Sequence, residues 1–78
     1  MRVRLRFFAA YRDIVGSEEL CLELPAGSEA RSAVSHLRTQ FPRLPERPVV
    51  AINREFCSLE DPLSEGDELA LLPPVAGG

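Results

Sequence analysis

The sequence contains no lysine: all nine of its basic residues are arginine, and it has a single histidine. A chain without lysine cannot receive an isopeptide bond on its own side chains, so any conjugation through its C-terminus must modify another protein. The sequence also lacks a long apolar run, and its first residues, MRVRLRFF, alternate instead of forming the apolar block of a signal peptide. The net charge is −3 without a basic patch, which argues against a nucleic-acid partner. We therefore expect a cytoplasmic protein that binds neither nucleic acid nor membranes.

Residue types that often mark metal or redox sites are scarce. Cys21 and Cys57 lie far apart in unlike contexts and form no metal-ligand or redox spacing. We expect both to be small, buried or half-buried hydrophobic residues, with a redox or sulfur-relay role as the alternative. His36 falls outside the apolar stripe of a predicted helix and is expected at the surface. No metal site is predicted.

Two amphipathic strands are predicted near the start of this 78-residue chain, which is long enough for one domain. In residues 1–7, apolar side chains alternate with arginines, and in residues 18–24 leucines alternate with glutamates and one cysteine. If the strands pair antiparallel, arginines can face glutamates, and each such pair contributes about 0.2–1 kcal/mol and helps to fix the register. The segment AAYRDIVG between them predicts a helical turn or a wide loop that ends at Gly16.

One amphipathic helix of about three turns is predicted after a Pro-Ala-Gly break. Ser28 is a suitable N-cap, apolar residues recur at helical spacing from Ala30 to Phe41, and Pro42 ends the helix. The remaining chain predicts a proline-rich loop over residues 43–48, then strands in VVAI, EFCSL and ELALL. Asn53-Arg54 is expected to form a turn, and the stretch EDPLSEGD a longer connection.

This order of elements predicts an α+β fold of the β-grasp (ubiquitin-like) type, in which a mixed sheet curls around one main helix. The last strand is expected to lie beside the first, near the centre of the sheet. Residues 1–72 would form this domain, and residues 73–78 an extended, flexible tail that ends in Gly-Gly.

The tail begins with residues that restrict the backbone and ends with residues that have no side chains. Pro73 and Pro74 cannot continue a hydrogen-bonded ladder and keep the backbone extended, whereas Gly77 and Gly78 carry no side chains. Six extended residues span about 20 Å at roughly 3.3 Å per residue. Such a tail can place its terminal carboxyl deep inside the active site of another protein, although an ordinary frayed terminus is the alternative.

Three segments carry a specific resemblance: FFAAYRDIVG at residues 7–16, AINRE at 51–55 and DPLSEGDELALLPPVAGG at 61–78. With the element order between them, they resemble the MoaD/ThiS family of ubiquitin-like sulfur carriers over essentially the whole chain. Within that family, the sequence is more similar to the small subunits of molybdopterin synthase (MoaD type). The thiazole-pathway carriers (ThiS type) are usually shorter and lack the first segment.

The resemblance implies a chemistry centred on Gly78. A partner enzyme adenylates its carboxylate with ATP, and a sulfur donor then displaces AMP to leave a thiocarboxylate. The resemblance also implies that sulfur passes to cyclic pyranopterin monophosphate in the synthase large subunit, and that two transfers build the dithiolene of molybdopterin. The tail residues Pro73, Pro74, Val75, Ala76 and Gly77 would guide this insertion, with Gly77 giving clearance.

The implied partners are an E1-like adenylating enzyme (MoeB type) and a large subunit (MoaE type) in a heterotetramer. No general base or oxyanion group is evident, so the chain is expected to be a sulfur-donating subunit whose partner supplies the catalytic groups and whose own sequence binds no cofactor. Two successive partners need a shared docking patch, for which Phe8, Phe56, Leu59 and Leu72 are the candidates. A core position fits Phe8 and Phe56 equally well.

Other functions use the same tail. The chain could be a sulfur carrier for thiazole or tRNA thiolation, or a ubiquitin-like modifier that forms an isopeptide bond with a partner lysine. A binding module with an accidental glycine end is a third alternative. The residues alone do not separate the first two from a molybdopterin role, because all use the Gly78 carboxyl.

Overall fold

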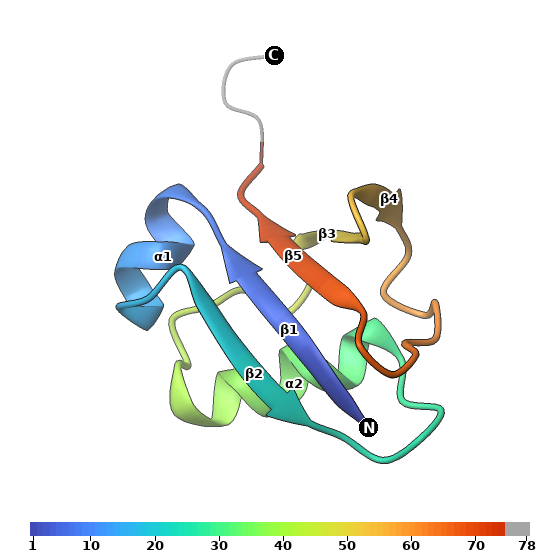
Figure 1. Cartoon of the computed structure of the whole chain (residues 1–78). Helices are drawn as coiled ribbons and strands as arrows, with labels where there is room; N and C mark the ends of the chain where they lie inside the picture. The colour runs from blue at the N-terminus through green and yellow to red at the C-terminus, as the bar shows by residue number, and fades with distance from the viewer. Residues whose placement is uncertain (75–78) are drawn as a thin grey trace.

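The computed structural model describes residues 1–74 of the chain. Five strands and two helices follow one another in the order that the sequence predicts, with AAYRDIVG forming a true helix (Figure 1). In chain order they are β1 (Arg2–Phe7), α1 (Ala9–Val15), β2 (Glu19–Glu23), α2 (Ala30–Gln40), β3 (Val49–Ile52), β4 (Glu55–Cys57) and β5 (Glu68–Leu72).

The strands form one mixed sheet in the order β2-β1-β5-β3-β4. The last strand, β5, lies in the middle, parallel to β1 and antiparallel to β3. This arrangement confirms the predicted fold and the central position of the last strand. Because β5 pairs on both sides, the point where the chain leaves the sheet is held by two hydrogen-bonded ladders.

The two faces of the sheet differ in character. Alternate residues of β1 and β5 point toward α2 and are almost fully buried, while the intervening residues point to the opposite side, which we call the outer face. Helix α2 covers the inner face (Figure 1). The buried core contains Val3, Leu5, Phe7, Tyr11, Leu24, Ala30, Ala33, Val34, Leu37, Leu44, Val50, Leu59, Leu63, Leu69 and Leu71.

The first two strands pair antiparallel, as predicted, with Arg2 opposite Glu23 and Arg6 opposite Glu19. Arg2 and Glu23 form an ion pair at 3.1 Å. The ion pair of Arg6 goes instead to Glu68 of β5, at 3.8 Å. The arginine face of β1 therefore interacts with strands on both of its sides.

The start of α2 differs from the sequence prediction by one residue. Glu29, and not Ser28, precedes the first helical residue, and its side chain makes no capping hydrogen bond. The Ser28 hydroxyl donates to a carbonyl of the preceding turn, at 2.7 Å. A capping side chain is not needed here, because the N–H of Ala30 donates to the carbonyl of Asp61 at 2.9 Å. The connection before β5 thus satisfies the helix end that a local cap was expected to satisfy.

The placement of the cysteines is confirmed only in part. Cys57 is half-buried, but Cys21 is exposed, because it points to the outer face from the edge strand β2. His36 lies on the exposed side of α2, as expected. Within residues 1–74, no helix is long and apolar enough to cross a membrane.

Candidate docking surface at the base of the C-terminal segment

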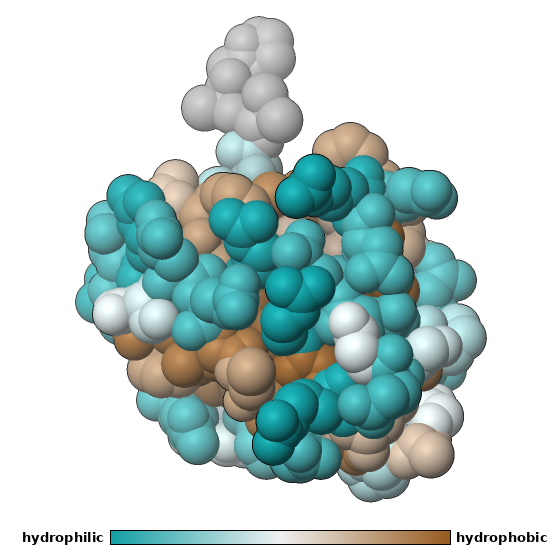
Figure 2. Space-filling view, viewed as in Figure 1, coloured by the Kyte–Doolittle hydropathy of each residue, from teal (hydrophilic) through white to brown (hydrophobic). Residues whose placement is uncertain are grey.

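An apolar hollow of ≈ 280 Å³ lies on the outer face where β5 ends. Its apolar lining consists of Phe8, Ala51, Phe56, Ala70 and Leu72, which we call the outer-face patch. Charged side chains of three further residues complete the lining: Arg6, Arg54 and Glu68. Figure 2 shows hydrophobic atoms near the base of the C-terminal segment, with hydrophilic atoms around them.

Strand alternation places Leu72 in this patch. Leu69 and Leu71 point into the core and are fully buried, so Leu72 points outward, where it pairs with Val49 of β3. Leu72 remains half-buried by its neighbours on the outer face. The register predicted from the sequence is therefore the observed one.

Both phenylalanines of the candidate patch are exposed, and a core position for either is wrong. Phe56 lies on the short edge strand β4, opposite Ala51, with 80% of its surface exposed. Phe8 follows β1 and is 37% exposed. Large aromatic side chains left uncovered on one face are typical of a binding surface.

Leu59 does not belong to this surface, and its placement there was wrong. It is only 6% exposed and packs in the core. Leu59 is three positions after the outward-pointing Phe56, so strand alternation would itself place it on the opposite face, and β4 ends before it, at Cys57. Its carbonyl accepts a hydrogen bond from the N–H of Arg31, at 2.8 Å, which fixes this loop against the N-terminal end of α2.

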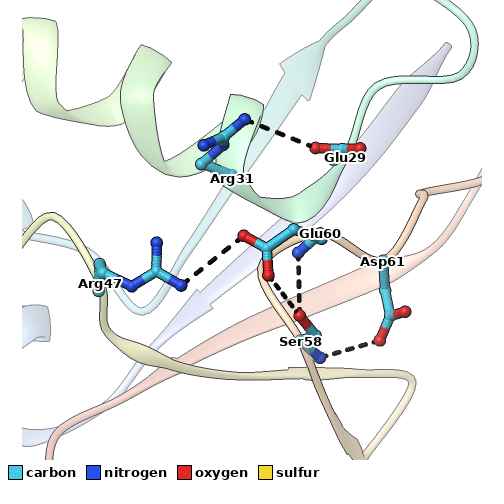
Figure 3. Close-up of polar contacts among 6 residues, drawn as sticks. All are labelled: Glu29, Arg31, Arg47, Ser58, Glu60 and Asp61. Carbon is cyan, nitrogen blue, oxygen red and sulfur yellow. Dashed lines mark hydrogen bonds and ion pairs between the residues drawn. The ribbon is translucent and has the colours of Figure 1, made fainter.

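Polar contacts hold that loop in place on the far side of the sheet (Figure 3). The Ser58 hydroxyl donates to Glu60 at 2.7 Å, and the Ser58 N–H donates to Asp61 at 2.8 Å. The hydrogen bond from the Ser58 hydroxyl is the main reason that the pKa of Glu60 lies below its ordinary value. The guanidinium of Arg47, 3.6 Å from the Glu60 carboxylate, lowers the pKa further. These exposed groups support the loop.

A charged group that the sequence analysis missed lies within the candidate surface. Glu68 is only 9% exposed, and its carboxylate lies 3.8 Å from Arg6. Arg6 in turn stacks over the ring of Phe8, with 5.4 Å between the guanidinium carbon and the ring centroid. The Glu68 N–H donates to the side chain of Asn53, at 3.0 Å. The outward alternation of residues 68, 70 and 72 was the signal that could have placed Glu68 here.

Most of the residues predicted to act in the tail lie outside the described structure. Pro73 is half-buried and Pro74 exposed, directly after β5. The predicted insertion residues Val75, Ala76 and Gly77, and the predicted reactive residue Gly78, lie outside the described residues. Among residues 1–74, no group of three or more His, Cys, Asp or Glu side chains could hold a metal ion.

Comparison with known structures defines the class of protein. SAMP1 from Haloferax volcanii superimposes with a TM-score of 0.84 at 26% identity, covering 100% of both chains. A complex of subunits 1 and 2 of molybdopterin-converting factor from Helicobacter pylori contains a chain with a TM-score of 0.65 and 29% identity, again covering 100% of both chains. The fold is therefore the ubiquitin-like β-grasp.

Comparison of sequences defines the family. The model of the ThiS family matches residues 5–78, so the chain belongs to this family. The molybdopterin synthase sulfur carrier subunit of Aedes aegypti is 39% identical over 90 residues, which cover 100% of this chain and 90% of that protein.

Proposed function

We propose that this protein is the sulfur carrier subunit of a molybdopterin synthase. The observation that carries the proposal is the extent of the family match, which runs to Gly78, the residue on which the chemistry depends. A relative with this function is similar over the full length of the chain. The position of the outer-face patch, next to the end of β5, supports docking of a partner that also receives the tail.

The chemical role falls on the carboxylate of Gly78. One of its oxygens attacks the α-phosphorus of ATP in an adenylating enzyme, and pyrophosphate leaves. Hydrosulfide, released by a sulfur donor, then adds to the acyl carbon and displaces AMP, which leaves a thiocarboxylate. Because Gly77 and Gly78 have no Cβ, the backbone can approach a nucleotide in a narrow channel.

The folded domain would bind the partner and thereby position this tail. Strand β5 is fixed on both sides, so the first tail residues, Pro73 and Pro74, start from a defined position. Docking of the outer-face patch on the large subunit would bring the thiocarboxylate into the active site and shield it from water. Sulfur would then pass to cyclic pyranopterin monophosphate, with catalytic groups supplied by the large subunit.

Mass spectrometry of the intact chain tests the proposal. Incubation with the cognate adenylating enzyme, ATP and a sulfur donor should exchange one oxygen of Gly78 for sulfur. A variant that lacks Gly78 is the matched control, and it should melt at the same temperature because the buried core lies within residues 3–71. An unchanged mass of the full-length chain, with an enzyme and donor shown to be active on another carrier, would refute the proposal.

The likeness to SAMP1, a small archaeal modifier protein, supports protein modification as a second candidate. In that case the activated Gly78 would form an isopeptide bond with a lysine of another protein, since this chain has none. Adding lysine-containing acceptor proteins to the activation reaction separates the two functions. A sulfur carrier should accumulate as the free thiocarboxylate, whereas a modifier should appear in covalent conjugates.

The family model also leaves a thiazole-pathway carrier as a candidate. The receiving enzyme distinguishes the two pathways. We expect the thiolated chain to convert cyclic pyranopterin monophosphate to molybdopterin with the synthase large subunit. Sulfur transfer to a thiazole synthase in its place would reassign the pathway while preserving the carrier role.

A further inference from the structure

We infer that the partner surface that covers the outer-face patch carries carboxylates opposite Arg4 and Arg54. The inference rests on the proposed function, because it takes the docking of a partner protein as given. It adds the electrostatic character of that partner, which the family match does not state.

The charges around the patch are unbalanced. Arg4 and Arg54 line a second hollow, of ≈ 230 Å³, which adjoins the first and shares both Arg54 and Glu68 with it. Among residues 1–74, the charged side chains that line the two hollows are three arginines and one glutamate. The whole chain has a net charge of −3, so this region is locally positive on an acidic protein.

The single carboxylate cannot neutralise all three arginines. Glu68 pairs with Arg6 at 3.8 Å and has a side chain that is only 12% exposed. In the register Glu68 lies opposite Arg4, but the ion pair that it forms is with Arg6, which also has Glu19 of β2 opposite it. Arg4 and Arg54, which are exposed, remain available to carboxylates of a docked protein.

Arg54 occupies a backbone position that favours glycine. The pairing of Ile52 with Glu55 leaves a two-residue turn between β3 and β4, and Arg54 is its second residue. Its φ of 71° lies in the left-handed region, where an Asn-Gly turn would have glycine. An arginine at this position is unfavourable for the turn itself, which points to a role for its side chain at the surface.

The same charges argue against a second copy of this chain as the occupant. In a two-fold symmetric contact, each patch meets an identical patch, so the arginines of one copy would face those of the other. Like charges placed opposite one another in a contact oppose association. An acidic rim around an apolar pocket would complement both the arginines and the exposed Phe56.

The variant Arg54→Gly tests the inference, because folding and binding should respond in different directions. Glycine relieves the backbone strain, so the thermal midpoint should stay the same or rise. Affinity for the molybdopterin synthase large subunit, measured by calorimetric titration at low salt, should fall by about fivefold. Arg54→Lys keeps the charge and should bind within about twofold of the unmodified chain.

Two further measurements isolate the charge. The loss caused by Arg54→Gly should shrink at about 0.5 M salt, where exposed charges are screened. Arg43→Gly removes an exposed arginine from the loop after α2, outside both hollows, and should leave affinity unchanged. Unchanged affinity in Arg54→Gly, or an equal loss in Arg43→Gly, would overturn the inference. Binding to the large subunit that does not depend on salt would also overturn the inference. If the same chain still becomes thiolated on Gly78, the proposed function is unaffected by that result.

Discussion

Phe56 and Leu59 lie three residues apart, yet truncation of each to alanine should affect different properties of the protein. Phe56 is 80% exposed on the outer face, whereas Leu59 is 6% exposed and packs in the core. We expect Phe56→Ala to weaken partner binding and leave folding intact. Leu59→Ala should destabilise the fold and affect binding only through the loss of folded protein.

The magnitude follows from the exposed area. A fully covered phenylalanine buries about 150–250 Å², and four fifths of the Phe56 surface is still uncovered in the free chain. A partner could therefore cover up to about 120–200 Å², which at about 25 cal/mol per Å² gives an upper limit of about 3–5 kcal/mol. We expect Phe56→Ala to cost about 2–4 kcal/mol in binding, a loss of at least about thirtyfold in affinity.

Leu59→Ala should lower the stability of the fold. Removal of a buried leucine side chain costs about 2–5 kcal/mol of unfolding free energy, because the neighbouring core residues do not fully close the cavity. Phe56 leaves no cavity when it is truncated, because it is exposed. Phe56→Ala should therefore lower the unfolding free energy of the free chain by no more than about 0.5 kcal/mol, as at other surface positions.

Two assays give both quantities for each variant. Calorimetric titration with the large subunit measures binding, and thermal unfolding of the free chain measures stability. Normal affinity of Phe56→Ala would exclude this side chain from the contact and refute the outer-face patch as the docking surface. A normal melting curve for Leu59→Ala would contradict its core position.

Three other predictions concern the same structure. Leu72→Arg should leave the free domain folded but weaken large-subunit binding by roughly a hundredfold or more, because it places a guanidinium in the apolar centre of the contact. Calorimetric titration measures the affinity, and a melting curve of the free variant shows whether it is folded. Burial, the largest cause, raises the pKa of the Cys57 thiol, so Cys57 should be alkylated more slowly than the exposed Cys21, and unfolding in urea should abolish the difference. Since the folded pKa of Cys57 is the higher one, its contribution to stability is present below pH 9.0 and is lost as the pH rises further. Amide hydrogen exchange should be slower in β5 than in β4, and equal rates would contradict the central position of β5.

The sequence predicted the sheet well, because its strands carry a strong alternation. In residues 3–7 the period of two determines both the strand and the face that is buried, and in residues 69–72 it separates the fully buried Leu69 and Leu71 from Leu72. That rule placed Leu72 outside and its neighbours inside. It worked because the pattern is local: each strand shows its own inner face without reference to the others.

The errors occurred where burial depends on contacts between distant segments. Leu59 lies in a loop that carries no period, and its burial follows from closure of that loop against the N-terminal end of α2. Ser28 was a reasonable cap by local rules, but a carbonyl from residue 61 satisfies the helix N-terminus instead. Alternation could have placed Glu68 on the outer face, but its ion pair with Arg6 and its proximity to Arg54 arise only when β5 lies between β1 and β3.

The outer-face patch joins a firmly held part of the sheet to a loosely held part. Leu72 and Ala70 belong to β5, which pairs with a strand on each side, whereas Phe56 belongs to β4, a three-residue strand at the edge of the sheet. Displacing β5 would break two ladders, but shifting β4 would break one short ladder. The root of the tail can therefore remain fixed while the Phe56 ring adjusts to a partner. Under the proposed function two partners share this patch, and the arrangement would let β4 adjust to each of them while Leu72 keeps its position.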